Sequence, residues 1–227
     1  MTASGGQLNP WALGGVLFAV FFIVGLVLGG VLASSPFPLP GATAAEVARY
    51  FTESQTAVLV SGLFQILSAI SLFVFAAPVA TLVRRTEGGA GALPGLTLGG
   101  GALAAVFLLV SALLGWVLAL TAGGLGLELV DTLRNLNFLT GGTLHVASLG
   151  LFVGAASIST LNARALPRWI LWLGLAAAAL SILSLASLLF FPASILIPLG
   201  RLLAFVWCIA MGIVLALGRR RETRTGS

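Results

Sequence analysis

Residues 125–161 read LGLELVDTLRNLNFLTGGTLHVASLGLFVGAASISTL and change character partway along. In the first third, leucines recur at helical spacing while acidic, basic and amide side chains occupy the other faces, which predicts a short amphipathic helix at a membrane surface. Residues 139–161, the rest of this stretch, carry no formal charge. An apolar run of about 20 residues is long enough to cross a bilayer core of about 30 Å. The segment therefore predicts an interfacial helix followed by a membrane span over residues 138–161.

The composition of the whole chain agrees with a membrane location. Of its 227 residues 59% are hydrophobic and only 7% are charged, and the mean hydropathy is +1.14. Such a chain is too apolar for a soluble domain and too long for one or two spans. The net charge of +5 arises from arginines, most of which lie at the ends of apolar runs. These arginines set topology, so we expect no nucleic-acid-binding patch.

The other apolar runs complete the predicted fold. We predict an all-α polytopic membrane protein in which a single domain, residues 1–227, holds six transmembrane helices in one bundle. The predicted spans cover residues 11–33, 56–83, 97–120, 138–161, 169–190 and 195–218. A capping-box pattern at Thr43 predicts a second short interfacial helix, which ends at about Thr52. Both short helices are expected on the outer side of the membrane.

Small residues recur at helical spacing on two of the predicted spans. Gly25 and Gly29 form a GxxxG pair, and Gly150, Gly154 and Ser157 form a second stripe. Because lipid is as apolar as a helix surface, close approach at small residues and a few polar contacts hold a membrane bundle together. We therefore expect the bundle to pack through these stripes. For the GxxxG pair, ordinary glycine richness in a chain with 29 glycines is the alternative.

The distribution of arginine predicts the orientation of the chain. Eight arginines fall in the loops between spans two and three and between spans four and five and in the tail 219–227, whereas only Arg49 and Arg134 fall in the opposite loops. Cytoplasmic loops carry the excess of positive charge in membrane proteins. Both termini and the basic tail are therefore predicted to be cytoplasmic.

Several short motifs at helix ends carry a resemblance to a known group of proteins. They are Glu46-Val-Ala-Arg-Tyr-Phe51, Arg84-Arg85, Ala165-Leu-Pro-Arg-Trp169, Leu171-Trp-Leu-Gly174 and the Arg219-Arg-Arg tail. With them, nearly the whole chain resembles the six-helix bacterial membrane proteins grouped as a domain of unknown function, which are common in actinobacteria. The resemblance implies a six-helix fold and a location in the bacterial plasma membrane. It implies no reaction and no ligand.

Three strongly polar side chains interrupt the predicted spans: Gln65, His145 and Arg201. At about 1.5 Å per residue from the outer span ends, they lie roughly 11–14 Å deep and so share one depth in the outer half. Such groups are costly in hydrocarbon and usually face the bundle interior with a partner. We hypothesise an outward-opening pocket in which Arg201 and His145 bind an anionic headgroup or small anion and Gln65 orients it.

Charged residues of the interfacial helix, Glu128, Asp131 and Arg134, are the candidate outer rim of this pocket. They belong to the amphipathic segment that precedes the fourth span, which places them above the polar band.

Each of the three deep residues also has a structural explanation. If Pro198 is the first residue of the last span, Arg201 lies close enough to the surface to snorkel to the outer headgroups. His145 is explained equally by a hydrogen bond to a carbonyl one turn away or to Thr143. Gln65 is explained by a hydrogen bond between helices.

The sequence gives little support to catalysis. It contains no HExxH, no CxxC, no paired carboxylates within a span and no serine with a recognisable base. It also contains no lysine, and Cys208 is its only cysteine. We therefore expect a protein that is not an enzyme, with no catalytic residues, no metal site and no cofactor.

Two functional classes remain. The first is a non-catalytic module that binds a lipid or small amphiphile, or an accessory subunit of a membrane complex. The alternative is a small transporter or channel that uses the polar band in the outer half, although the two halves of the chain show no repeat of the kind found in many transporters. The expected partners are the bilayer itself, a lipid or small anionic ligand, and either further copies of the chain or another membrane protein.

Overall fold

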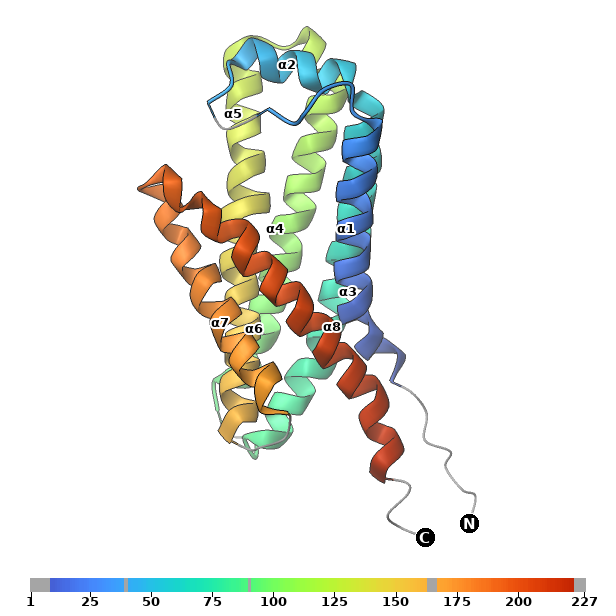
Figure 1. The fold of residues 1–227 in the computed structure, drawn as a ribbon, viewed down its shortest axis with the longest axis vertical. Coiled ribbons are helices and arrows are strands. Elements are labelled where there is room, and N and C mark those ends of the chain that lie inside the picture. The colour runs from blue at the N-terminus through green and yellow to red at the C-terminus, as the bar shows by residue number, and fades with distance from the viewer. Residues whose placement is uncertain (1–8, 39–40, 90, 163–166, 223–227) are drawn as a thin grey trace.

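The computed structural model describes residues 9–38, 41–89, 91–162 and 167–222, and every regular element within these ranges is helical (Figure 1). The elements are, in chain order, η1 (Pro10–Leu13), α1 (Gly14–Leu32), α2 (Ala44–Glu53), α3 (Gln55–Thr86), α4 (Leu93–Thr121), η2 (Ala122–Gly124), α5 (Leu127–Phe138), η3 (Leu139–Leu144), α6 (His145–Asn162), α7 (Arg168–Leu183), η4 (Ser184–Leu188), η5 (Phe191–Ile195) and α8 (Leu196–Glu222). Among the short elements η3 is π-helical and the others are 3₁₀ helices.

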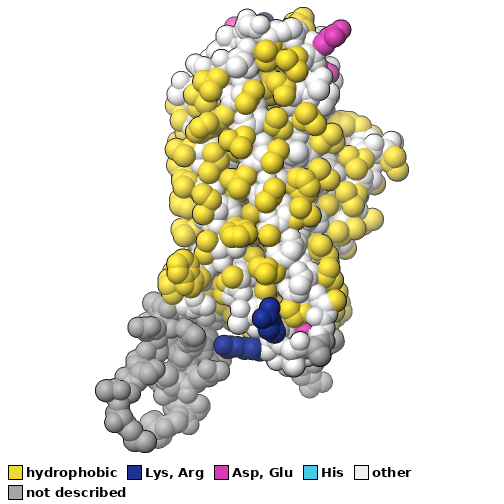
Figure 2. All heavy atoms as spheres, turned by 180° about the vertical axis from the view of Figure 1, so that it is seen from behind, with side chains coloured by type: hydrophobic (Ala, Val, Ile, Leu, Met, Phe, Trp, Pro, Cys, Tyr) yellow, Lys and Arg dark blue, Asp and Glu magenta, His cyan; other side chains and the backbone are white. Residues whose placement is uncertain are grey.

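The structure confirms the predicted all-α polytopic bundle. Within the described ranges six helical segments are long and apolar enough to cross a membrane, and each overlaps one of the predicted spans. They are Pro10–Leu32, Gln55–Thr86, Leu93–Gly124, Leu127–Leu161, Arg168–Leu188 and Phe191–Leu217. Figure 2 shows hydrophobic side chains over most of one face of the molecule, with arginines near the end where the chain termini lie. A broad apolar belt of this kind is what contact with lipid requires.

The segment Leu127–Leu161 differs from its prediction in one respect. Where the sequence predicts a separate interfacial helix before the span, α5 continues through η3 into α6 in one line (Figure 1). The segment has 35 residues and is therefore about 50 Å long, whereas the hydrocarbon core is about 30 Å thick. The amphipathic pattern of α5 thus belongs to the part of a long helix that extends beyond the apolar layer.

This long segment is also the most enclosed of the six. In its most apolar window 78% of the residues are buried, against 22–44% for the other spans. The ring of Phe152 on α6 packs edge-on against Phe75 of α3 and Trp207 of α8, with centroids 6.0 and 5.7 Å apart. All three side chains are fully buried, so α6 joins the two sides of the bundle.

The two stripes of small residues pack as the sequence predicts. A Cβ atom on Gly25 would lie 2.7 Å from the Cβ of Phe64, and one on Gly29 would lie 3.0 Å from the Cβ of Ser61. The GxxxG pair therefore serves the contact of α1 with α3 inside this chain. Gly150 similarly packs closely against Ser181 of α7, and Gly154 against Ala178 of the same helix.

Helix α2 lies across the end of the bundle opposite the chain termini (Figure 1). A capping box at Thr43 and Glu46 starts the helix, as the sequence pattern predicts. Its apolar face buries Val47, Tyr50 and Phe51 in a small second core with residues of α3, α4, η2 and α5. Helix α2 is therefore a packed cover on that end of the bundle.

Candidate ligand-binding cavity

A cavity of about 840 Å³ lies inside the bundle beneath α2. Helices α1, α3, α4, α5 and α8 form its walls, and the connector between α1 and α2 lies across it. Its lining is Phe22, Ile23, Gly25, Leu26, Gly29, Gly30, Ala33, Ser34, Ser35, Pro36, Phe37, Tyr50, Phe51, Val58, Ser61, Gly62, Gln65, Ser111, Ala112, Gly115, Asn137, Pro198, Arg201, Leu202 and Phe205. Ligand pockets commonly have volumes of about 300–1,000 Å³, so this cavity is large enough for an organic ligand.

Arg201 of α8 reaches the cavity from the wall rather than extending to the membrane surface. Its guanidinium carbon lies 4.8 Å from the ring centroid of Phe22 on α1, an arrangement in which the ring face attracts the cation. One terminal nitrogen donates a hydrogen bond to the carbonyl of Gly141 in the π-helical segment η3. Arg201 therefore faces the interior, which excludes the snorkelling explanation.

The positive charge of Arg201 has no counter-ion in the described part of the chain. No Asp or Glu is among the cavity-lining residues, and the only ion pair in the described ranges joins Arg134 to Asp131. The Nε atom of Arg201 is buried and has no hydrogen-bond partner there. Since a guanidinium is always charged and carries five N–H donors, most of its donor capacity faces no protein acceptor.

Gln65 of α3 lines the same cavity as Arg201, so the structure brings these two predicted site residues together. Its side chain is half-buried and forms no hydrogen bond with any described residue. The structure therefore does not support the alternative that Gln65 forms a hydrogen bond between helices. Its amide is a free donor and acceptor that faces the cavity.

His145 does not line the cavity. The side chain is fully buried, and its Nδ1 lies 2.8 Å from the carbonyl oxygen of Ala104 on α4. Since a carbonyl only accepts, Nδ1 carries the proton and donates this bond. The ring also meets Phe18 of α1 edge-on, with centroids 6.2 Å apart. His145 thus bonds neither of the acceptors that the sequence suggests, a carbonyl one turn away or Thr143: its acceptor is a carbonyl of the neighbouring helix α4, and Thr143 lies within hydrogen-bond distance of Ser187.

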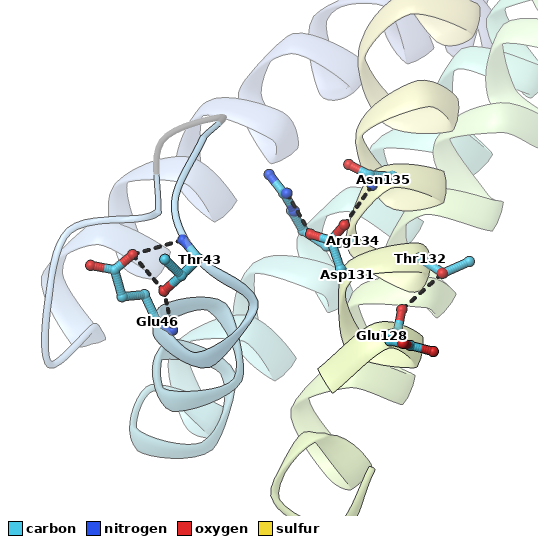
Figure 3. Close-up of polar contacts among 7 residues, drawn as sticks. All are labelled: Thr43, Glu46, Glu128, Asp131, Thr132, Arg134 and Asn135. Carbon is cyan, nitrogen blue, oxygen red and sulfur yellow. Dashed lines mark hydrogen bonds and ion pairs between the residues drawn. The ribbon is translucent and has the colours of Figure 1, made fainter. Parts of the chain in front are cut away.

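The three candidate rim residues lie on α5, and none of them lines the cavity. Figure 3 shows Arg134 and Asn135 both directed at the carboxylate of Asp131, with distances of 2.6 and 3.1 Å. Glu128 accepts a hydrogen bond from Thr132 through its backbone carbonyl. These residues form a local network along one helix beside α2.

A polar pair that the sequence analysis did not select joins α4 to α5 at the cavity wall. Asn137 donates its amide N–H to the carbonyl of Ser111 at 2.7 Å, and the Ser111 hydroxyl donates to the carbonyl of Asn137 at 3.2 Å. Both residues line the cavity. They fix the start of η3, whose Gly141 carbonyl holds Arg201. In the sequence, the one feature that could have identified this pair is the position of Asn137 as the last amide before the charge-free run. That feature is weak evidence, because asparagine is common at helix ends.

The cover of the cavity is held by polar contacts at both ends of α2. The Ser34 hydroxyl donates to the Glu53 carbonyl at 2.8 Å, and the Ser34 N–H donates to the Ser54 hydroxyl at 3.1 Å. At the other end the Thr43 N–H donates to the Glu46 carboxylate at 2.7 Å (Figure 3). This backbone hydrogen bond, with one from the Thr43 side chain, lowers the pKa of Glu46.

Comparison with known protein families, curated protein sequences and solved structures finds no match to this chain. The class of the protein therefore follows from its own architecture. It is an all-α, multi-pass integral membrane protein. In its described part it holds a cavity of about 840 Å³ with Arg201, a cation without a counter-ion there, in the wall.

Proposed function

We propose that this membrane protein is a non-catalytic module that binds a lipid or small amphiphile with an anionic headgroup in the cavity beneath α2. The observation that carries the proposal is Arg201, a cation inside the bundle whose only partners among the described residues are a neutral carbonyl and an aromatic ring. A charged side chain at the centre of a span costs roughly 2.5–3.5 kcal/mol on insertion scales. An anionic ligand would offset that cost by supplying the missing counter-charge.

The other walls of the cavity fit the second half of an amphiphile. In the same cavity as Arg201, the amide of Gln65 and the polar pair Ser111–Asn137 supply donors and acceptors for a headgroup. Phe22, Leu26 and others make the rest of the wall apolar. Ligand sites of this kind combine a mostly apolar surface with a few placed polar groups. The arrangement therefore supports a ligand that is anionic at one end and apolar elsewhere.

The orientation and location of the protein belong to the same proposal. With the termini and the basic tail in the cytoplasm, α2 and the cavity lie in the outer half of the bilayer. The resemblance to six-helix bacterial membrane proteins points to the bacterial plasma membrane. The ligand would then come from the outer leaflet or the space outside it.

A small transporter or channel is the second candidate. The observation that favours it is the π-helical segment η3 between α5 and α6, whose Gly141 carbonyl holds Arg201, since π-helical turns within longer helices are frequent at functional sites. A liposome flux assay separates the two candidates. Robust uptake of any solute would favour transport, whereas retention of a ligand without flux favours a binding module or an accessory subunit.

Native mass spectrometry of the protein released from nanodiscs tests the proposed binding. The nanodiscs contain phosphatidylcholine with a minority of phosphatidylglycerol, and the variants are Arg201→Gln and, as a matched loss of one positive charge, Arg168→Gln. Arg168 is exposed at the other end of the bundle. We expect the wild type and Arg168→Gln to retain one anionic lipid, and Arg201→Gln to lose at least about tenfold in occupancy, because hydrogen bonds to charged groups contribute about 1.5–3 kcal/mol.

Equal occupancy in all three proteins would refute the proposed site. If Arg201→Gln fails to fold, Gln65→Leu serves as the second variant. It removes a polar group that faces the cavity and makes no hydrogen bond with the described residues, so a loss of occupancy there reports on ligand contacts.

A further inference from the structure

We infer that the ligand is resident in the membrane and enters the cavity sideways, through a gap between α1 and α8, with its headgroup at Arg201 and its apolar chain lying in the gap. The inference rests on the proposed function and adds the route and the orientation of the ligand. It excludes a water-borne anion as the natural occupant.

The first observation is that residues on the lipid-facing side of α1 and α8 belong to the cavity wall. Leu26 of α1 is 67% exposed and Leu202 of α8 is 55% exposed, and both line the cavity. Ile23, one turn before Leu26, is also exposed and also lines the cavity. Phe37 in the connector is also exposed and cavity-lining, but it belongs to the side that faces water, whereas Ile23, Leu26 and Leu202 form an apolar mouth on helices α1 and α8. In a membrane such a mouth faces acyl chains.

The second observation is the way α1 and α8 pack. Close contact occurs near the ends of the chain, where a Cβ atom on Gly212 of α8 would lie 2.7 Å from the carbonyl of Ala12. From there α8 runs obliquely away from α1 toward the α2 end (Figure 1). Because the two helices diverge, the gap between them widens at the level of Arg201 and Leu202. At this level Phe22 of α1 still contacts Arg201 and Phe205 of α8. The opening therefore lies on the α2 side of Phe22, where Leu26 and Leu202 line the cavity.

The third observation is that the cavity is covered on the side of α2. The rings of Phe37, Tyr50 and Phe51 pack edge-on, with centroids 5.2–6.4 Å apart, and all three line the cavity. Ser34 ties the connector to the end of α2 and to Ser54 by two hydrogen bonds. A water-borne anion would have to pass this aromatic cover, whereas a lipid would pass only apolar side chains.

The route also fits the distribution of polarity inside the cavity. Arg201 lies below the aromatic cover, so an amphiphile that entered from water headgroup first would drag its apolar chain past it. An amphiphile that enters sideways keeps its chain among Ile23, Leu26 and Leu202 while its headgroup reaches the guanidinium. It meets apolar surface along its whole path, which is the favourable environment for an acyl chain.

The test follows the exchange of bound phosphatidylglycerol for a deuterated form supplied in phosphatidylcholine vesicles, measured by native mass spectrometry over time. Leu202→Trp narrows the gap. Its matched control is Val206→Trp, one turn further along α8, which is similarly exposed at 49% but lies outside the cavity lining. Phe37→Ala thins the aromatic cover. Inorganic phosphate, added as the water-borne probe, is scored by its effect on thermal stability.

We expect Leu202→Trp to slow exchange about tenfold or more, because entry then requires the helices to move apart, while Val206→Trp and Phe37→Ala exchange like the wild type. Inorganic phosphate should leave the melting temperature unchanged. Unaltered exchange in Leu202→Trp, or faster exchange in Phe37→Ala, would overturn the lateral route while leaving the binding site intact. Stabilisation by phosphate together with no retained lipid would overturn the membrane-resident ligand. Loss of lipid from every protein, the wild type included, would instead refute the proposed function.

Discussion

Single residues decide what the interior of this bundle can do. Counting along the sequence predicts a similar depth for Arg201 and His145 and does not distinguish them, yet their surroundings differ. The proton of His145 Nδ1 has an acceptor in Ala104, whereas the guanidinium of Arg201 has one carbonyl for five N–H donors. Although Nε2 of His145 is buried without a partner among the described residues, only the arginine lines the cavity, so the arginine is the candidate ligand contact.

Substitution of His145 separates these roles. We expect His145→Phe, which keeps an aromatic ring against Phe18 but loses the hydrogen bond to Ala104, to destabilise the protein by about 1–2 kcal/mol. Lipid occupancy in native mass spectra should stay at the wild-type level, because His145 does not line the cavity. Thermal unfolding in detergent measures the first effect. A variant of normal stability that no longer retains lipid would show that His145 belongs to the site.

At the scale of elements, much could be predicted from the sequence. The six spans follow from apolar runs of membrane length, and α2 follows from its capping box and amphipathic face. Glycine spacing identifies the close-packed faces of α1, which meets α3, and of α6, which meets α7. The π-helical segment η3 could not be predicted, because its sequence LTGGTL has no marker that distinguishes it from ordinary helix. Because η3 supplies the Gly141 carbonyl that accepts a hydrogen bond from Arg201, the geometry of the site could not be predicted from the sequence either.

Two adjacent glycines of α4 test helix packing. A Cβ atom on Gly100 would lie 2.7 Å from the backbone nitrogen of Phe152, whereas one on Gly99 would meet nothing within 4 Å. Alanine favours helix over glycine by about 0.5–1 kcal/mol at either position. We therefore expect Gly99→Ala to be neutral or stabilising and Gly100→Ala to destabilise by about 1–3 kcal/mol, the usual cost of overpacking. Equal melting temperatures in detergent would contradict the close contact of α4 with α6.

The capping box predicts that the start of α2 depends on pH. Because the pKa of Glu46 is lowered in the folded protein, its contribution is present above the ordinary carboxyl pKa of 4.5 and is lost as the pH falls through the folded value. We expect hydrogen exchange at the start of α2, corrected for intrinsic rates, to be less protected at pH 3 than at pH 6. Glu46→Gln retains a capping side chain without a titrating group and should show no such change. The same loss of protection in Glu46→Gln would exclude Glu46 as the cause.

At the scale of the whole molecule, the cavity arises from how helices cross. Helix α8 contacts α1 near the chain ends and diverges from it toward α2, and this obliquity leaves the space that Arg201 faces. Crossing angles depend on many side chains at once, so apolar periodicity gave the number of spans but no indication of a gap. Depth counting grouped Gln65 with Arg201, and both line the cavity. It failed to separate His145 from them, because depth along a helix says nothing of the direction in which a side chain points.

The most direct test of the central claim is a density map of the protein in lipid nanodiscs, determined by electron cryomicroscopy with a rigid binding fragment added for size. We expect an elongated density in the cavity whose compact end contacts the guanidinium of Arg201 and whose tail passes between Leu26 and Leu202 into the surrounding lipid. A map in which α8 closes against α1 and Arg201 contacts only protein would contradict both the binding site and the lateral gap.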